Sequence, residues 1–472
     1  MSHSKPQADV RLQYDRGTLL ATGLSAGQVG RASGEGVWAW DRRVGAWRCD
    51  AIHYGAVRRA FVEAFGRTFR DEVPSPAGVN WPRVELPQLR PEQSAALDAW
   101  DRAGRRGQVV MPTGTGKTVV ALAAMARTRT ATLVVAPIRD LMYQWHRRIL
   151  AALGCDAGIV GDRLHDIRPV TVTTYDSAYI HAAEMGSRFG LLVFDEEHHL
   201  PGPCRRDAAI MSVAPMRLGL TATPERSDGR HADLPALIGP EVYRMALARA
   251  RGESLADYDV VRVPVALTRE EQATYDECTR LVRHYLSARR RERKGYGWED
   301  LCRDADCDPA ARKAQKAYYL KQSIEDRAAE KLRVLEDIFR LHAGGRILVF
   351  AGSNVMAMEV SRRFCLPTIL SHTRKRERHA VLDGFAAGRL PVLVANRVLD
   401  EGVDVPEAKV AVVIGGQGST RQAKQRLGRI LRKTGRARAT LYEVVCENTR
   451  DEQRSRKRRR SDAYERTRHR RI

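Results

Sequence analysis

The chain has 472 residues, with 80 Lys and Arg against 57 Asp and Glu, which gives a formal net charge of +23. This length allows about three domains of ~150 residues, and a hydrophobic content of 43% excludes a wholly disordered chain. The charge favours a polyanionic partner, nucleic acid before a membrane surface, because we find no basic amphipathic anchor and no run of ~18 apolar residues.

The expected compartment follows from the cysteines and the N-terminus. Eight cysteines are spread over the chain, a pattern that favours reduced thiols inside a cell over a disulfide framework. The start of the chain lacks the basic segment and apolar stretch of a secretory signal. High Arg, Ala and Gly usage favours a prokaryotic source, so we expect a cytoplasmic, nucleoid-associated protein with no membrane partner.

The first part of the chain, residues 1–70, predicts a small N-terminal α+β domain. Trp38, Trp40 and Trp47 alternate about a turn, which predicts a hairpin with these rings in the sheet core. A stacking platform for bases is the alternative. Residues 71–88 hold four prolines and are expected to form a linker.

Two clusters of short apolar runs, at 89–245 and 326–450, predict two α/β lobes. Runs of four to six apolar residues without alternation are typical of strands buried on both faces of a parallel sheet, with helices crossing between them. The expected strands are 107–111, 131–138, 191–197 and 217–223 in the first lobe and 346–352, 391–396 and 409–416 in the second.

Two basic segments accompany the lobes. Residues 268–325 predict a helical insertion with a loop at 295–297. This insertion is either a solvated linker or a projection that contacts nucleic acid, and the second interpretation depends on the basic cluster at 289–294 and its aromatic neighbours. Residues 451–472 predict a solvated, flexible tail, with non-specific phosphate contact as the alternative.

The most specific motif is Met-Pro-Thr-Gly-Thr-Gly-Lys-Thr at 111–118, between an expected strand and an expected helix. Its glycines let backbone N–H groups and the helix N-terminus point at phosphate oxygens. Lys117 can reach the β- and γ-phosphates, and the Thr118 hydroxyl can ligate Mg²⁺. The strict pattern has glycine where this chain has Met111, but the following core is intact. We predict a nucleotide site formed by Thr113, Gly114, Thr115, Gly116, Lys117 and Thr118.

A second motif, Leu-Leu-Val-Phe-Asp-Glu-Glu-His-His at 191–199, places acids at the end of an expected strand. Proteins with such a phosphate loop position their metal carboxylate and their water-activating base in this way. Asp195 is expected to hold Mg²⁺, and Glu196 to orient or deprotonate the attacking water. His198 and His199 could be zinc ligands, but no cysteine lies at ligand spacing, so we favour a polar link to γ-phosphate sensing.

A third motif, Gln-Arg-Leu-Gly-Arg-Ile-Leu-Arg, begins at Gln425 in the expected second lobe. Arg429 and Arg432 lie about one helical turn apart, and Gly428 permits a close backbone approach. Two arginines directed at a triphosphate would supply charge to the transition state, as arginine fingers do. A basic helix alone would mean little, so this interpretation depends on the other two motifs.

Taken together with GLTATPERSDG at 219–229 and DEGVDVPEA at 400–408, these motifs resemble those of superfamily 2 helicases. Within that superfamily the chain is most similar to the XPB family, over about residues 10–450. The resemblance implies two RecA-like lobes that clamp ATP and Mg²⁺ and move on DNA, expected 3′ to 5′. It also implies a role in DNA repair, nucleotide excision repair first, and a partner such as a nuclease.

The resemblance gives roles to residues around the first lobe. Arg90 and Gln93, in LRPEQ, match the motif that recognises adenine. Thr221 and Thr223 match the motif that couples the state of ATP to nucleic-acid binding, as His198 does.

The same resemblance extends to the other parts of the chain. Gly402 and Asp404 match a motif near the γ-phosphate and the DNA backbone. The N-terminal domain is loosely similar to the family's damage-recognition domain, and the 268–325 insertion resembles its thumb.

One motif departs from the family. An Arg-Glu-Asp triplet linked to duplex opening is here Arg226-Ser227-Asp228, so the middle carboxylate is absent unless Glu225 substitutes. This change bears on strand separation and leaves ATP hydrolysis untouched. It favours a duplex translocase that does not separate strands as one alternative. An RNA helicase and an inactive nucleic-acid-binding scaffold are the others.

Overall fold

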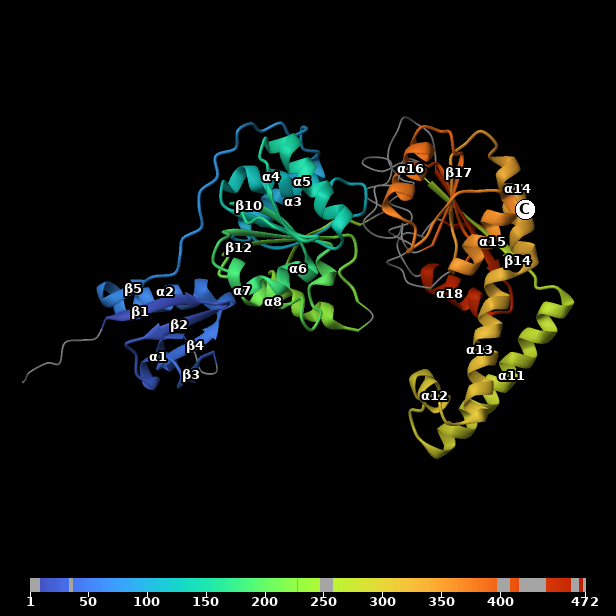
Figure 1. The fold of residues 1–472 in the computed structure, drawn as a ribbon, viewed down its shortest axis with the longest axis horizontal. Helices are drawn as coiled ribbons and strands as arrows, with labels where there is room; N and C mark the ends of the chain where they lie inside the picture. The colour runs from blue at the N-terminus through green and yellow to red at the C-terminus, as the bar shows by residue number, and fades with distance from the viewer. Residues whose placement is uncertain are drawn as a thin grey trace, which may run out of the picture. The chain divides into compact units, whose positions relative to one another are not determined.

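The computed structural model describes residues 9–33, 37–226, 228–246, 258–396, 408–415, 439–459 and 467–469. The chain divides into two compact units, Met1–Ala246 and Leu247–Ile472, and each is described by itself (Figure 1). Within the described residues, every helix is too short or too polar to cross a lipid bilayer.

The N-terminal domain is a five-stranded sheet with the strand order β3-β4-β2-β1-β5. Its elements are β1 (Val10–Asp15), β2 (Thr18–Thr22), α1 (Ala26–Ser33), β3 (Ala39–Asp41), β4 (Ala46–Asp50), α2 (Tyr54–Phe65) and β5 (Phe69–Asp71). The predicted hairpin is confirmed, because β3 and β4 pair antiparallel with Trp40 opposite Trp47. Trp38 stacks on the core residue Phe61 with ring centroids 5.8 Å apart. The core prediction is wrong for Trp40, which is 49% exposed because β3 is the edge strand.

The N-terminal domain docks on the first lobe through polar and apolar contacts within the same unit. The Tyr14 hydroxyl lies 3.0 Å from the carbonyl oxygen of Ala183 and 3.2 Å from that of Met211. A Cβ atom at Gly17 would come within 2.2 Å of the Met211 side chain, so glycine at this turn allows the close approach.

The first lobe is the predicted parallel sheet, with the order β13-β6-β12-β11-β7-β10-β8-β9 and only the β8–β9 pair antiparallel among its described strands. The strands are β6 (Arg106–Val110), β7 (Thr132–Ala136), β8 (Gly158–Gly161), β9 (Leu164–His165), β10 (Val170–Thr174), β11 (Leu191–Asp195), β12 (Met216–Thr221) and β13 (Glu241–Arg244). The helices are α3 (Pro91–Arg102), α4 (Lys117–Thr128), α5 (Arg139–Leu153), α6 (Tyr175–Ile180), α7 (Ala182–Met185), α8 (Asp207–Ile210) and α9 (Leu234–Leu237).

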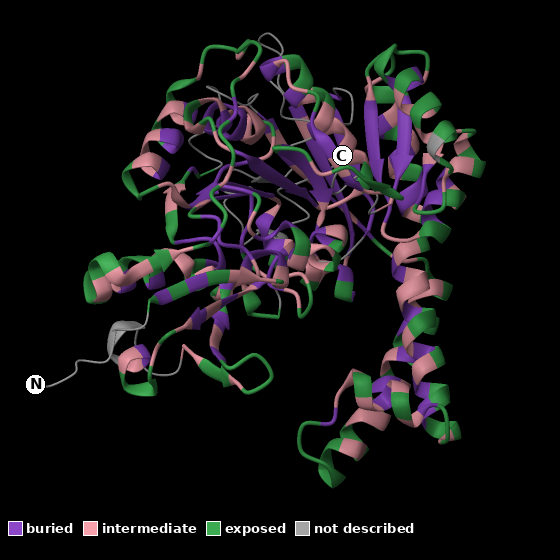
Figure 2. Cartoon of the chain, turned by 60° about the vertical axis from the view of Figure 1, so that its left-hand side comes forward, coloured by how far each residue is buried: buried purple, intermediate pink, exposed green. Residues whose placement is uncertain are grey.

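The strand order of this lobe positions its motifs. The central strands are buried on both faces, as their unbroken apolar runs predict (Figure 2). β6, β12 and β11 are neighbours and run parallel. Their carboxyl ends therefore meet at one edge of the sheet, where open α/β sheets bind ligands.

The second lobe is a parallel sheet with the order β16-β17-β15-β18-β19-β14-β20. The strands are β14 (Tyr258–Val265), β15 (Ile347–Phe350), β16 (Thr368–Ile369), β17 (Val392–Ala395), β18 (Val410–Val413), β19 (Ala439–Cys446) and β20 (Thr467–His469). The helices are α14 (Ala329–Leu341), α15 (Asn354–Phe364), α16 (Lys375–Ala386) and α18 (Arg450–Arg459). The seven strands predicted for the two lobes are all present in the two sheets.

Two boundaries of the second lobe differ from expectation. β14 precedes the helical insertion in sequence yet pairs with β19 inside this sheet, so the lobe begins before the insertion. The flexible-tail prediction is wrong for residues 451–459, which belong to α18. The side chains of Asp451 and Ser455 are buried on its inner face. Asp451 accepts a hydrogen bond from the buried Lys331, and Ser455 donates one to the buried Glu443.

The insertion, here called the thumb, consists of α11 (Arg269–Glu292), α12 (Trp298–Asp304) and α13 (Pro309–Arg327). Its helical character and its loop before α12 are confirmed. Tyr296 in that loop is buried and its hydroxyl donates to Asp304 at 2.6 Å, while Arg289 pairs with Asp308 at 2.7 Å. These two members of the basic and aromatic cluster therefore serve the thumb's own structure.

Candidate nucleotide site

The loop at 111–116 follows β6 and leads into α4, the strand–loop–helix arrangement that the sequence predicts. Gly114 and Gly116 have φ values of +89° and +86°, in the left-handed region that favours glycine. A Cβ atom at Gly116 would lie 2.3 Å from the amide nitrogen of Gln93. The loop thus has the tight turn and the helix N-terminus that bind phosphate.

Gln93 holds this loop from α3. Its amide nitrogen donates to the carbonyl oxygen of Thr115 at 2.8 Å, and its amide oxygen accepts from the backbone N–H of Arg90 at 3.0 Å. Gln93 is only 3% exposed. The structure therefore brings Gln93 and the backbone of Arg90 to the phosphate loop.

The side chains of Lys117 and Thr118 form hydrogen bonds within the described part of the protein, and that of Thr113 does not. The Lys117 ammonium donates to the carbonyl oxygens of Met111 at 3.0 Å and Pro112 at 3.4 Å. The Thr118 hydroxyl accepts from the guanidinium of Arg148, on α5, at 2.9 Å. Thr113 carries a buried hydroxyl with no hydrogen-bond partner among the described residues. A bound phosphate would give this hydroxyl a partner.

Asp195 ends β11 beside these groups. One carboxylate oxygen accepts from the indole N–H of Trp145 at 2.8 Å, and its backbone carbonyl accepts from the Tyr175 hydroxyl at 3.0 Å. Burial and the charge of Glu196 raise the pKa of Asp195 to about 6, against the opposing effects of the Trp145 hydrogen bond, Lys117 and Arg148. A cation placed on this carboxylate would remove the cost of its charge.

Glu196 is the first residue of a short polar chain. Its φ of +50° is in the left-handed region, which a non-glycine residue adopts at an energetic cost. Its carboxylate accepts from the Thr221 hydroxyl at 3.3 Å, and the same hydroxyl lies 3.0 Å from Nδ1 of the buried His198. The backbone N–H of Thr223 donates to the Thr221 hydroxyl at 3.1 Å. The structure thus joins the acid motif to the Thr-Ala-Thr motif.

Several residues of the site were not singled out from the sequence. Arg148 falls on α5 with no motif to mark it, and only the fold brings it to Thr118. Glu197 is fully buried, and burial raises its pKa well above the usual value. Among the described residues its carboxylate has no hydrogen-bond partner.

A cavity of about 360 Å³ opens beside the loop. Its walls combine the start of α4 with the end of α5 and one residue of the linker. The lining residues are Glu85, Gly116, Thr118, Val119, Leu122, Arg148, Ala151 and Ala152. An apolar wall next to a phosphate loop suits a planar base or a ribose.

Some predicted site residues lie outside the described residues, namely Gln425, Arg429, Arg432, Gly402 and Asp404. The eight cysteines are free thiols. Among the described residues, the group of side chains that could hold a metal ion away from the nucleotide site is His165, His181 and Glu184, and does not include His198 or His199.

Three family models match the chain. "Xeroderma pigmentosum group B helicase damage recognition domain" matches residues 12–73, "Type III restriction enzyme, res subunit" matches 86–226, and "ERCC3/RAD25/XPB C-terminal helicase" matches 313–462. The last match reaches into α18, consistent with the place of this helix in the second lobe.

Curated relatives cover the chain along most of its length. It is 38% identical to the DNA 3′-5′ translocase XPB2 of Sulfurisphaera tokodaii, over 95% of this chain and 100% of that protein. It is 33% identical to the DNA 3′-5′ helicase XPB of Kineococcus radiotolerans, over 77% of this chain and 61% of that protein. The chain thus spans the whole of the first relative and under two thirds of the second.

Solved structures share the fold at low sequence identity. Saccharomyces cerevisiae Dbp5 bound to RNA and ADP BeF3 matches with a TM-score of 0.55 at 14% identity, over 81% of this chain and 89% of that one. The Pyrococcus furiosus Hef helicase domain matches with a TM-score of 0.51 at 18% identity, over 78% of this chain and 97% of that one. These likenesses support the two-lobe α/β fold alone.

Proposed function

This chain belongs to the XPB family of superfamily 2 helicases, and from that premise we propose that it hydrolyses ATP to move 3′ to 5′ on DNA. The observation that supports this most directly is the meeting of three motifs at one sheet edge. The phosphate loop follows β6, the acids follow β11 and Thr221 ends β12. This arrangement couples a nucleotide site to the motif that responds to nucleic acid.

Each group at the edge has a defined part in hydrolysis. Lys117 would exchange its carbonyl partners for the β- and γ-phosphates, and Thr118 and Asp195 would hold Mg²⁺. Held by these two residues, Mg²⁺ would supply positive charge to the phosphates. Glu196 would take the proton of the attacking water on its carboxylate. The unpaired Thr113 hydroxyl and the raised pKa of Asp195 support this assignment.

The hydrogen bonds that start at Glu196 would transmit a change in its charge to other residues. A charge change at Glu196 alters the hydrogen bonds of the Thr221 hydroxyl, and through it those of His198. Arg226 donates to the backbone carbonyl of His198 at 2.6 Å. The proposed path therefore leads from the hydrolytic base to the triplet linked to duplex opening.

The remaining site assignments extend the same proposal. Gln93 and Arg90 would position the loop and the base, with the 360 Å³ cavity as the space for the nucleoside. From the resemblance, we propose that Gln425, Arg429 and Arg432 act on the γ-phosphate, and that Gly402 and Asp404 belong to the motif near the γ-phosphate and the DNA backbone.

DNA is the proposed polymer, and its phosphates suit the net charge of +23. We propose that the N-terminal domain, which matches a damage-recognition model, directs the motor to DNA repair, with nucleotide excision repair first and a nuclease as the expected partner. Association with a prokaryotic nucleoid follows from the same proposal.

Movement along duplex DNA without strand separation is a second candidate function. The relative at 38% identity is named a translocase. Glu225, the residue that could replace the missing carboxylate, instead lies 3.3 Å from the guanidinium of Arg244. Both observations favour tracking over unwinding.

Steady-state ATPase measurements test the function. Turnover is measured without polymer and with single-stranded DNA, duplex DNA or RNA, and the Lys117→Ala variant is the control. DNA-stimulated turnover that vanishes in the variant supports a DNA motor, and stimulation by RNA alone would refute it. A strand-displacement assay beside a triplex-displacement assay then separates unwinding from duplex tracking.

A further inference from the structure

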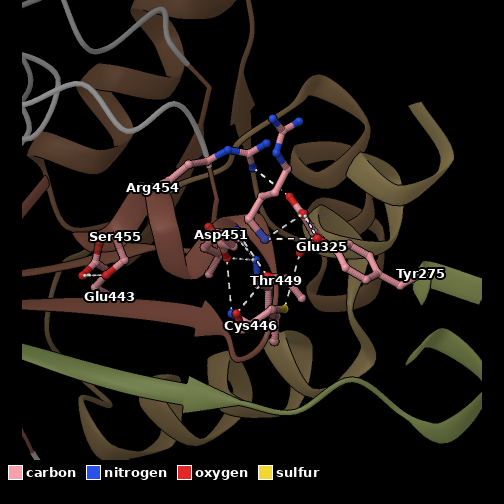
Figure 3. Close-up of polar contacts among 11 residues, drawn as sticks. Tyr275, Glu325, Glu443, Cys446, Thr449, Asp451, Arg454 and Ser455 are labelled. Carbon is pink, nitrogen blue, oxygen red and sulfur yellow. Dashed lines mark hydrogen bonds and ion pairs between the residues drawn. The ribbon is translucent and has the colours of Figure 1, made fainter. Parts of the chain in front are cut away.

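A buried polar network lies where the thumb joins the second lobe (Figure 3). Glu325, near the end of α13, has no exposed surface. One of its carboxylate oxygens accepts from the Tyr275 hydroxyl of α11 at 2.7 Å and from the backbone N–H of Arg450 at 3.2 Å. The other lies 3.0 Å from the guanidinium of Arg454. One carboxylate thus joins both long thumb helices to α18.

A second buried charge joins the same helix to the sheet. Lys331, in the first turn of α14, is fully buried and pairs with Asp451 of α18 at 2.8 Å. Its ammonium also donates to the backbone carbonyl of Ile414 at 3.0 Å. Ile414 directly follows β18 and precedes in sequence the segment that holds Arg429 and Arg432. The network therefore contacts the strand that leads to the arginine motif.

These contacts fix one arrangement of the thumb root. Apolar side chains can slide past one another, but a buried charge has few alternative partners, and separating it from them is strongly unfavourable. Lys321 lies 4.8 Å from the centre of the Tyr275 ring, and the Arg450 guanidinium lies 5.3 Å from that of Tyr318. The first contact joins the two long thumb helices, α13 and α11, and the second crosses the junction from α18 to α13.

The length of the thumb makes this rigidity consequential. α11 has 24 residues and spans ~36 Å at 1.5 Å per residue. A tilt of ~5° at the root would therefore move the thumb tip by ~3 Å, close to the ~3.4 Å rise of one DNA base pair. A thumb root that tilts by this amount would therefore cancel a movement of about one base pair.

We propose that Glu325, Lys331 and Asp451 are positioning residues that make the thumb and the second lobe one rigid body, so that movement of the lobe reaches the DNA without slip. This rests on the proposed function, in which the thumb contacts DNA. The network takes no part in binding or hydrolysing ATP, so its loss should alter the distance moved for each ATP and spare turnover without DNA.

The test replaces the buried pair by apolar residues of similar size, Lys331→Met with Asp451→Leu. Changing both avoids a lone buried charge, and such swaps are often neutral for stability. The matched control is Arg333→Met with Glu330→Leu, which removes the largely exposed pair on the same helix. The measurements are DNA-free ATPase, DNA-stimulated ATPase and triplex displacement, from which base pairs moved per ATP are derived.

We expect DNA-free ATPase within twofold of wild type and at least a threefold fall in base pairs moved per ATP, with the control unchanged. Equal movement per ATP in a folded variant would overturn the proposal. Glu325→Gln keeps the shape of its side chain and loses the ion pair with Arg454. This variant is expected to show the same fall in base pairs moved per ATP. It replaces the double variant in the test if the double variant does not fold.

A structural readout separates this proposal from the function itself. Spin labels introduced as non-natural amino acids at Lys294 in the thumb and Ala343 in the second lobe report their distance distribution. A single narrow distribution in wild type that broadens in the double variant supports the rigid body, and equal widths refute it. Failure of the proposed function has a different signature, the absence of DNA-stimulated turnover in wild type.

Discussion

The ionised form of Asp195 costs the fold free energy, and replacing this residue by asparagine should reveal that cost. The Asp195→Asn variant keeps an oxygen that can accept from the Trp145 indole and removes the ionisation. Burial and Glu196 raise the pKa of Asp195 from 3.8 to about 6. Each pKa unit corresponds to ~1.4 kcal/mol, so the ionised side chain costs the fold about 3 kcal/mol.

The pKa values of Asp195 in the unfolded and folded states determine how stability changes with pH and over which pH range. Below pH 3.8 the carboxyl group is neutral in the folded and unfolded states and costs nothing. Between the two values the unfolded state ionises first, so the wild-type protein loses stability as pH rises, until the full cost is present above pH 6. The linkage relation gives a cost of about 3 kcal/mol at pH 8 and about half of that at pH 5.

The measurement is the melting temperature of the transition that Mg²⁺ and ATP shift in wild type. We expect Asp195→Asn to raise it by about 6–12 °C at pH 8 and by about half as much at pH 5, since a unit of this size gains ~2–4 °C for each kcal/mol. Asp98→Asn, at the half-exposed side chain of α3, is the control. A gain of the same size at both pH values, or none at pH 8, would refute the reasoning.

Three further outcomes are expected. Glu196→Gln should bind ATP with wild-type affinity and lose turnover at least ~100-fold, the usual range for a general base; weak ATP binding by this variant in a titration would make Glu196 structural. Arg148→Met should tighten Mg²⁺-ATP binding several-fold, because the Thr118 hydroxyl no longer has to release a guanidinium; weaker binding would show that Arg148 contacts a phosphate. Truncation after Arg450 should lower the melting temperature of the second unit, because Lys331 loses its partner in a buried ion pair. An unchanged melting temperature would show that residues 451–472 do not stabilise this unit.

The sequence predicts the sheets well because their signal is local. An unbroken apolar run such as residues 191–194 is typical of a strand that is buried on both faces of a parallel sheet. The spacing of glycines around Lys117 likewise defines a backbone shape that binds phosphate. Both signals lie within a few consecutive residues, so they need no knowledge of the rest of the fold.

What the sequence misses depends on contacts between distant segments. β14 has an alternating pattern of buried and half-buried residues and lies before the thumb, so only its pairing with β19 assigns it to the second lobe. The basic composition of residues 450–459 predicts a solvated segment. Two side chains on one face, Asp451 and Ser455, reverse that expectation, because each meets a buried partner more than ten residues away.

The altered triplet at 226–228 keeps the contacts of its arginine but lacks its middle carboxylate. Arg226 lies 2.6 Å from Asp228 and 2.6 Å from the carbonyl oxygen of His198, so its connection to the hydrolytic chain is intact. Glu225 lies beside Arg244 instead, and the absent carboxylate has no replacement among the described neighbours of Arg226. In the proposed mechanism, Glu196 would be connected to this segment, which lacks the acidic group that the resemblance links to duplex opening. This combination favours a motor that tracks along duplex DNA, and it locates the difference from an unwinding enzyme outside the ATPase chemistry.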